Sequence, residues 1–442
     1  MIKFGYKGLN IIKIKVNSKA LKERGKNNAE SFTRKRKMGF VNLMHYILNK
    51  KGLSTNMEIN NFFNKTNQDI TMSAQSLLDQ RLKLNPEVFI DLNQEYLKTF
   101  YDEYEETDVK TYKGYLLKAI DGSDFEIPNT KKSKETYGVV KTKIESIPRA
   151  TVSTCYDLLN QYILDVIPEK FRTSEIEMAK RHMLKDQEIT KGYQSIYIMD
   201  RNYVSLEFMT YMIKNNIKFL SRLQSSYYEK ETNKMNSIDE VVELEHTKDR
   251  LDKRIFRDKE LRKYAKSKTS TKIRILKYIL NTGEIEYLIT NMEDFEYEEI
   301  VNLYSKRWGI ETLYNSLKNK LQIEKFTSSN KTIIEQDIYA GVLVYNMIQT
   351  MKNEATEEIE QKKYKHEMRV NENIAIGLFK NEMIDILLEE DDEKRLEKYD
   401  NLSKKMLKYK IPIRKDRNYK IEPRIKNKNS FNKLKGFWLY TP

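Results

Sequence analysis

Four side chains that could bind a metal ion and a phosphate lie along one face of a predicted helix near residue 310. Tyr304, Arg307, Glu311 and Lys318 follow one another at intervals of 3, 4 and 7 residues. At about 100° per residue, they fall within roughly 60° of one another around a helix. A carboxylate can hold a divalent cation, while a guanidinium, an ammonium and a phenol can hold phosphate oxygens beside it. An ordinary helix surface with an i,i+4 ion pair between Arg307 and Glu311 also fits this spacing, so both interpretations stay open.

Two further carboxylates follow apolar runs that predict buried strands. Asp121 follows residues 115–120, and Asp200 follows residues 196–199. Sites in α/β sheets are built at strand ends, and two carboxylates brought together repel each other unless a cation neutralises them. Either aspartate could instead serve only a turn. Asp124 is a rival for the first position, but we prefer Asp121 because Asp124 lies beyond a predicted Gly-Ser turn.

Strands mixed with helices are predicted to position these carboxylates. Besides the two runs above, the pattern predicts one or two strands within 151–167, another at 218–223, and helices at 173–184 and 204–214. Buried strands alternating with helices indicate an α/β core. Farther along, residues 273–280 and 284–290 flank Asn281-Thr-Gly283, which predicts a β-hairpin.

We predict five segments along the chain. They are a helical DNA-binding head at 1–105, the first part of the core at 106–224, a β-rich insertion at 225–292, the second part of the core at 293–350, and a charged, largely helical C-terminal region at 351–442.

The head is predicted to hold three short helices behind a basic arm. The arm is Arg34, Lys35, Arg36 and Lys37. Apolar residues at helical spacing then run from 40 to 48, a capping box of Thr55 and Glu58 opens a second helix ending near Phe63, and a third helix spans residues 73–84. This arrangement suits a DNA-binding unit of helix-turn-helix type. A plain helical bundle is the alternative.

The overall charge favours a polyanionic partner. The 442 residues carry a formal net charge of +15, and such a surplus is typical of proteins that bind nucleic acid, although lysine-rich composition alone could produce it. From Lys404 to Lys435, thirteen Lys or Arg stand against two acids, a local balance of +11. A tail of this kind commonly follows phosphates; the alternative is a tail that is merely solvated.

Several other classes of protein are disfavoured. The single cysteine, Cys155, has no partner for a disulfide or a thiolate metal site, and the four histidines lie far apart in sequence. No run of 18 apolar residues predicts a membrane span, and the N-terminus lacks the apolar core of a signal peptide. We therefore expect a cytoplasmic protein.

The spacing Tyr304-x2-Arg307-x3-Glu311-x6-Lys318 resembles the Y-(2)-R-(3)-E-(6)-K signature of DDE transposases of bacterial insertion sequences. The run from Arg307 to Glu311, Arg-Trp-Gly-Ile-Glu, is also typical of that family. Asp200-Arg-Asn-Tyr203 is similar to its second-aspartate motif and Ala119-Ile-Asp-Gly-Ser123 to its first. The likeness covers about residues 113–350. Asn202 stands where glycine is usual, which a left-handed turn would tolerate.

The resemblance implies an RNase H-like mixed sheet flanked by helices, with the β-rich insertion between the second aspartate and the glutamate. It implies that two Mg²⁺ (or Mn²⁺) ions are held by Asp121, Asp200 and Glu311. The phosphate-binding residues would be Tyr304, Arg307 and Lys318. The implied activity is cutting at transposon ends, with DNA hairpins as an allowed intermediate, and joining of the 3′ ends to target DNA. Pairing of two ends implies a dimer on DNA.

Trp308 has two interpretations. It lies roughly 100° around the helix from Arg307. Stacking on a DNA base is one use for such a ring. Packing in the core or between domains is the other, and we favour it.

Three competing functions stay open. A nuclease with the same core would cut DNA without joining ends, and a DNA-binding regulator would show no metal-dependent cleavage. A glycosidase would also use two carboxylates, but the net charge of +15 and the Arg/Lys face disfavour it.

Overall fold

The computed structural model describes residues 3–413 except 35, 67, 69, 104–108, 142–144 and 280–282. Its helices are α1 (Phe4–Val16), α2 (Lys19–Arg24), α3 (Phe40–Leu48), α4 (Thr55–Lys65), α5 (Ala74–Arg81), α6 (Glu87–Glu103), α7 (Lys131–Tyr137), α8 (Glu175–Ile189), α9 (Leu206–Lys214), α10 (Glu229–Thr232), α11 (Lys259–Lys266), α12 (Tyr297–Ser305), α13 (Trp308–Asn315), α14 (Lys331–Glu360), α15 (Glu372–Leu388) and α16 (Asp392–Lys408). Short turns are the 3₁₀-helical η1 (Arg201–Tyr203) and η2 (Ser225–Tyr227) and the π-helical η3 (Ser316–Lys320). The strands are β1 (Tyr115–Glu126), β2 (Val139–Lys141), β3 (Ser146–Asp157), β4 (Ile163–Lys170), β5 (Gln194–Met199), β6 (Lys218–Leu223), β7 (Asp239–Glu245), β8 (Ser270–Ile279), β9 (Ile285–Thr290), β10 (Met368–Val370) and β11 (Lys410–Pro412).

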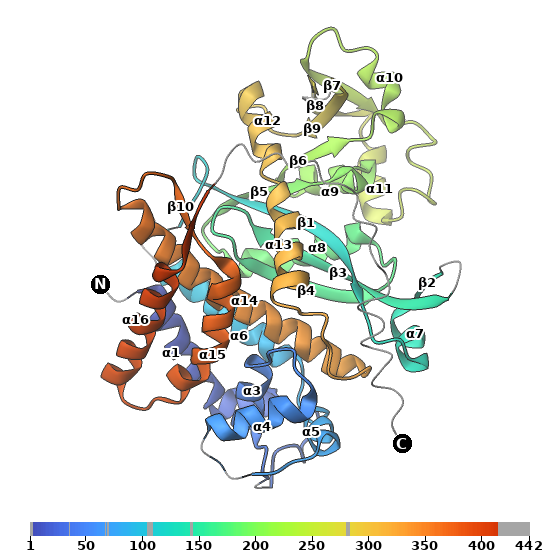
Figure 1. The fold of residues 1–442 in the computed structure, drawn as a ribbon. Helices are drawn as coiled ribbons and strands as arrows, with labels where there is room; N and C mark the ends of the chain where they lie inside the picture. Colours follow the sequence, from blue (N-terminus) through green and yellow to red (C-terminus); the bar gives the residue numbers. More distant parts are fainter. Residues whose placement is uncertain are drawn as a thin grey trace.

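A mixed sheet forms the centre of the molecule, as the sequence predicted. Its order is β2-β3-β1-β5-β6-β9-β8-β7, with β4 paired to β3. Strands β1, β5 and β6 are parallel, whereas β1 with β3 and β3 with β4 are antiparallel. Helix α8 packs on β3 and β4, and α12 and α13 cross another part of the sheet (Figure 1). The second part of the central strand β5, Ile196 to Met199, is apolar and buried throughout, as expected where both faces of a sheet are covered.

The predicted hairpin is confirmed, and it belongs to the core sheet. Strands β8 and β9 pair antiparallel on either side of Gly283. Strand β9 also pairs with β6, and β7 pairs with β8, so these strands extend the core sheet (Figure 1). The alternation of apolar residues could identify the hairpin but not the pairing of β9 with β6, because β6 lies more than 60 residues earlier in the sequence.

A long helix, α14, joins the two ends of the chain into one helical layer beneath the sheet (Figure 1). Several buried polar contacts link it to the N-terminal helices: Arg81 with Asp337, Asn93 with Asn346, and Tyr96 with Thr350. On the C-terminal side, the Tyr399 hydroxyl donates to Glu354 at 2.5 Å. The predicted boundary at 350/351 is therefore wrong, because it falls inside this helix.

The N-terminal region is helical, as predicted, and α1, α3 and α6 pack against α14. The expected helices correspond to α3, α4 and α5, and the sequence pattern missed α1, α2 and α6. The predicted capping box is also wrong. Glu58 instead accepts hydrogen bonds from the backbone N–H groups of Lys51 (2.7 Å) and Leu53 (2.9 Å). It thereby closes the loop between α3 and α4.

The basic arm and tail are only partly described. Arg34, Arg36 and Lys37 lie in the irregular segment before α3, where Lys37 donates to the Thr71 carbonyl at 2.9 Å. Lys35 and most of the basic tail, from 414 on, lie outside the described residues. None of the helices that the structure describes is long and apolar enough to span a bilayer.

Candidate active site

Neighbouring parallel strands place Asp121 and Asp200 side by side. The register pairs Ala119 of β1 with Ile198 of β5. Two residues farther on, Asp121 and Asp200 stand level on strands that are about 4.8 Å apart. Asp200 follows the last residue of β5 and accepts a hydrogen bond from the Asn202 backbone N–H at 2.8 Å.

The first aspartate does not end its strand. Strand β1 continues to Glu126, and Asp121 and Asp124 pair with Thr154 and Thr151 of β3. The Gly-Ser turn that we expected between the two aspartates is therefore absent. Since side chains alternate along a strand, residues three apart point to opposite faces. This alternation, rather than a turn, separates Asp124 from Asp121.

The second motif likewise needs no left-handed residue. Asn202 lies in η1, and it is not among the residues with positive φ. Asparagine is acceptable here because the 3₁₀ turn needs no positive φ. The sequence analysis had instead expected a left-handed turn that tolerates asparagine.

Electrostatics at this edge are unfavourable to ionised carboxylates. Burial, together with the Asp200 and Glu175 carboxylates, raises the pKa of Asp121 to about 7. The N–H of Gly122, at 2.9 Å, and the Arg307 guanidinium oppose the shift. Burial also raises the pKa of Glu175, with Asp200 and Asp124 adding to the effect. Carboxylates held together in this way are the arrangement that a divalent cation stabilises.

The sequence analysis missed Glu175 and Tyr203. Glu175 is the first residue of α8, and a Cβ added at Gly122 would lie 3.1 Å from its Oε1 atom. Tyr203 is buried with no hydrogen-bond partner for its hydroxyl, and burial and the nearby Glu175 and Asp121 carboxylates raise its pKa. Both residues lie near the aspartates only because α8 and η1 fold back over β1. In the sequence, Tyr203 could have been noticed as the last residue of the motif that begins at Asp200, whereas nothing marks Glu175.

The third motif is not one continuous helix, contrary to the prediction. Helix α12 ends at Ser305, α13 begins at Trp308, and the π-helical η3 follows α13. Bonds between residues three apart tighten the chain at the first junction: Arg307 N–H to Tyr304 O at 3.0 Å and Ile310 N–H to Arg307 O at 3.1 Å. Tyr304 therefore lies in α12, Arg307 in the turn before α13, Glu311 in α13 and Lys318 in η3. The angular spread of roughly 60°, calculated for one continuous helix, does not apply to them.

Tyr314 fixes α13 across β1. Its hydroxyl donates to the Asp121 carbonyl at 2.7 Å and accepts from Thr154 Oγ1 at 2.9 Å. One turn farther, the Lys318 ammonium donates to Ser123 Oγ and to the Asp124 carbonyl, both at 2.7 Å. Burial lowers the pKa of Lys318. Lys318 therefore holds η3 against β1, which the sequence did not predict.

Glu311 lies on α13 one turn before Tyr314, but its carboxylate faces Arg307. Arg307 donates to Glu311 Oε1 at 2.8 Å, and the Arg307 Nε atom is buried without a partner. Arg307 also lies over the rings of Tyr304 and Trp308, at 5.7 and 5.4 Å from their centroids. Within the described ranges, no three His, Cys, Asp or Glu side chains lie close enough to hold a metal ion. The expected carboxylate cluster is thus not preassembled.

Trp308 is exposed, and the interpretation that we favoured is wrong. Its side chain is 63% exposed and contacts Arg307. The ring lies on the surface beside the signature residues rather than in the core or between domains.

A second set of residues resembles a hydrolase triad but is sealed. His182 lies 2.7 Å from Asp165 Oδ2 and 3.0 Å from Ser153 Oγ. Ser153 and His182 have no exposed surface, and Asp165 has 3%. Since no substrate reaches a fully buried hydroxyl, this set stabilises the packing of α8 on β3 and β4.

Comparisons with known proteins agree with the motif. A family model described as "Transposase DDE domain" matches residues 112–347. A stretch of 75 residues is 32% identical to the transposase InsG for insertion sequence element IS4 of Escherichia coli (strain K12), covering 16% of this chain and 17% of that relative. The structure of a piggyBac transposase synaptic complex with hairpin DNA matches 90% of this chain and 84% of that chain, with a TM-score of 0.46 and 11% identity. That structural likeness is too low to carry an argument.

Proposed function

The chain belongs to the family of transposases that share this DDE domain, and on this premise we propose that it cuts transposon ends by metal-dependent phosphoryl transfer and joins the 3′ ends to target DNA. The observation that carries the proposal is the placement of Asp121 and Asp200 at one level on adjacent strands, beneath the helix that bears Glu311. The strand order β4-β3-β1-β5-β6 supports an RNase H-like core.

We propose Asp121, Asp200 and Glu311 as the ligands of two Mg²⁺ or Mn²⁺ ions. Carboxylate oxygens are the donors that these ions prefer, and burial beside the Asp200 carboxylate raises the pKa of Asp121, a cost of ionisation that a bound cation would offset. When bound, such ions supply activation of the attacking hydroxyl and stabilisation of the leaving oxygen. Glu311 is exposed and held by one i,i+4 pair. Exchanging that pair for a metal costs only about 0.3–0.5 kcal/mol.

Tyr304, Arg307 and Lys318 are proposed to hold phosphate oxygens near the cut. Once Glu311 leaves Arg307, the guanidinium has its forked face free for a phosphate. We propose that Trp308 stacks on a base beside it, and its exposed ring supports this role. Arg34, Lys35, Arg36 and Lys37 and the basic tail would add phosphate contacts farther out, on double-stranded DNA held by a dimer.

The test of the function is an end-cleavage and joining assay. Labelled duplex carrying the inverted repeats that flank the gene is incubated with target plasmid and either Mg²⁺ or EDTA. We expect nicked ends and joined products with Mg²⁺ only. Cleavage without joining would identify a nuclease, and binding without cleavage would identify a regulator; either result overturns the proposal.

Arg307→Ala is expected to lower the single-turnover rate of end cleavage about ten- to a hundredfold, because a charge-assisted phosphate bond contributes roughly 1.5–3 kcal/mol. Arg307→Lys should restore only part of the rate, since a point charge does not replace the fork.

Arg250→Ala is the matched control. Arg250 also pairs with a glutamate, Glu231 at 3.0 Å, and lies over a tyrosine ring at 5.4 Å. Its loss should cost similar stability in thermal melting but leave the cleavage rate unchanged. Equal cleavage rates in the two alanine variants would reduce Arg307 to a structural residue.

A further inference from the structure

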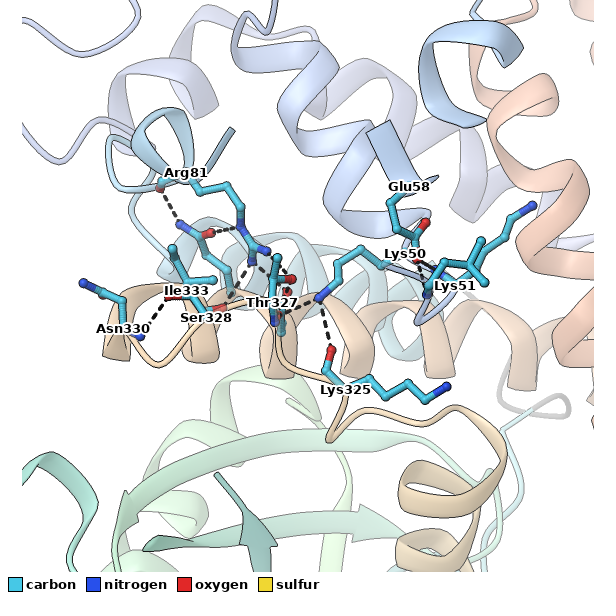
Figure 2. Close-up of polar contacts among 12 residues, drawn as sticks. Lys50, Lys51, Glu58, Arg81, Lys325, Thr327, Ser328, Asn330 and Ile333 are labelled. Atoms are coloured by element: carbon cyan, nitrogen blue, oxygen red, sulfur yellow. Dashed lines mark hydrogen bonds and ion pairs between the residues drawn. The ribbon is translucent and has the colours of Figure 1, made fainter. Parts of the chain in front are cut away.

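Four lysines gather where the loop after α3 meets the loop before α14. They are Lys50 and Lys51 from the first loop, Lys325 from the second, and Lys380 from α15. Lys50, Lys325 and Lys380 line one small cavity of about 40 Å³, together with Gly52 and Gln322. Figure 2 shows Lys50, Lys51 and Lys325 around this meeting of loops.

The negative groups nearby are already engaged. Asp337 accepts from Arg81 and from Lys50, both at 2.7 Å, so one carboxylate serves two cations. Glu58 is turned toward the backbone N–H groups of the α3–α4 loop (Figure 2). Among the described residues, no carboxylate lies within ion-pair distance of Lys325 or Lys380.

The cluster therefore carries uncompensated positive charge. Burial is the main cause that lowers the pKa of Lys380 to about 8; Glu58 opposes this shift, and the nearby Lys50, Lys325 and Lys51 contribute to it. The Lys380 ammonium finds one acceptor, the Leu321 carbonyl at 3.3 Å. Like charges held together repel, and an anion bound between them removes the repulsion.

The backbone holds the lysines in place. Gly52 has a positive φ of 79°, and a Cβ there would lie 2.8 Å from Lys325 Cδ. The stem of Lys325 thus lies directly across Gly52, which only glycine permits. Lys50 is fixed from the other side by Asp337 and by the Lys325 carbonyl at 3.5 Å. A cavity of this size has room for a few water-sized groups, which suits the oxygens of one phosphate and excludes a base.

The position relates the cluster to the candidate active site. Glu324, next to Lys325, accepts from the Glu126 backbone N–H at 2.9 Å. Glu126 lies five residues beyond Asp121 on β1, about 17 Å along the strand. The cluster therefore lies toward the Glu126 end of β1, beyond Asp121 along this strand.

We propose that Lys50, Lys325 and Lys380, which line this cavity, form a phosphate site that holds the backbone of the bound DNA away from the point of cleavage. This proposal rests on the proposed function, which supplies the ligand, a DNA phosphate. It adds a DNA contact that lies apart from the carboxylates proposed to bind metal.

The first experiment measures binding of a 30-base-pair duplex without metal, across a range of salt concentrations. Neutralising one phosphate contact should make the slope of log K against log [salt] less negative by about 0.9, which is about eightfold in affinity at 0.1 M salt. We expect this change in the double variant Lys325→Gln, Lys380→Met. Lys363→Gln, at an exposed lysine outside the cluster, is the matched control. A double variant that matches this control overturns the proposal.

Folding and ligand source are tested separately. Lys325 is exposed, so Lys325→Gln alone should weaken binding without changing the melting temperature. To identify the ligand, the rate of acetylation of each lysine is then measured by mass spectrometry, once with the duplex present and once with inorganic phosphate present. Slower modification of Lys325 and Lys380 with the duplex supports the proposal, and protection by inorganic phosphate alone overturns it. These experiments measure binding and not cleavage. If the protein does not cleave DNA but the lysine variants still change the salt dependence of binding, only the proposed function is contradicted, and the phosphate site is not.

Discussion

Asp121→Asn is expected to abolish metal-dependent end cleavage and at the same time to stabilise the metal-free protein. The loss of a ligand worth several kcal/mol of transition-state stabilisation lowers the rate by at least about a thousandfold. The gain in stability follows from the raised pKa. In the folded chain the carboxyl has a pKa of about 7 against an ordinary value of 3.8.

Stability should therefore depend on pH in a defined direction. Between pH 4 and 7 the folded state keeps a proton that the unfolded state has lost, so the free energy of unfolding falls as pH rises through this range. At pH 8 the ionised Asp121 costs the fold about 1–4 kcal/mol. Asparagine removes that cost, and the melting temperature of the variant should exceed that of the wild type at pH 8 but not at pH 4.

Thermal melting at both pH values, with EDTA present, checks the stability, and single-turnover cleavage checks the activity. Asp124→Asn is the control on the same strand, where the side chain points to the opposite face and accepts one long bond from Thr151 at 3.4 Å. It should change neither measurement much. If Asp124→Asn abolishes cleavage and Asp121→Asn does not, the first ligand has been assigned to the wrong residue.

Glu311→Gln is expected to lower end cleavage by a similar factor, again at least about a thousandfold, but to leave the melting temperature nearly unchanged. Its carboxylate is exposed and makes one ion pair, with Arg307, in a helical i,i+4 geometry. Such a pair contributes only about 0.3–0.5 kcal/mol. Activity and stability should therefore separate completely at this position.

The control is Glu335→Gln on α14, which breaks the i,i+4 pair with Lys331 at 3.6 Å. It removes the same kind of charge from the same kind of pair, far from the aspartates in sequence. Duplex binding in EDTA should be normal in both variants. Normal cleavage by Glu311→Gln would show that the carboxylate facing Arg307 in this structure has no part in metal binding.

The sequence predicted the core strands and the level of the two aspartates because these depend on short apolar runs. Strand β6 spans the predicted residues, and the β8–β9 hairpin lies at the expected position, although β8 begins three residues earlier than predicted. Asp200 follows its strand as expected. Asp121 does not follow the end of its strand, because β1 stays paired with β3 as far as Glu126. The apolar run showed where the buried part of the strand ends, but not where the strand itself ends.

What the sequence could not give are the contacts between distant segments. Glu175 and Tyr203 reach the aspartates through the packing of α8 and η1, and the exposure of Trp308 likewise depends on how the folded chain packs around it. The π turn at Ser316–Lys320 also has no signature in a pattern read at 100° per residue. The lysine cluster brings residues of the α3–α4 loop together with Lys325 and Lys380, more than 270 residues later in the sequence.

The place of α14 has a consequence for the timing of synthesis. The N-terminal helices end at Glu103, and the helix that buries them begins at Lys331, about 230 residues later. At roughly 5–20 residues per second, a ribosome needs about 10–50 s to make that stretch. During this interval the apolar faces that α6 and α1 will later turn to α14 stay exposed on the nascent chain. A product truncated before residue 331 would keep them exposed permanently, and so would bind chaperones or aggregate instead of forming a free DNA-binding fragment.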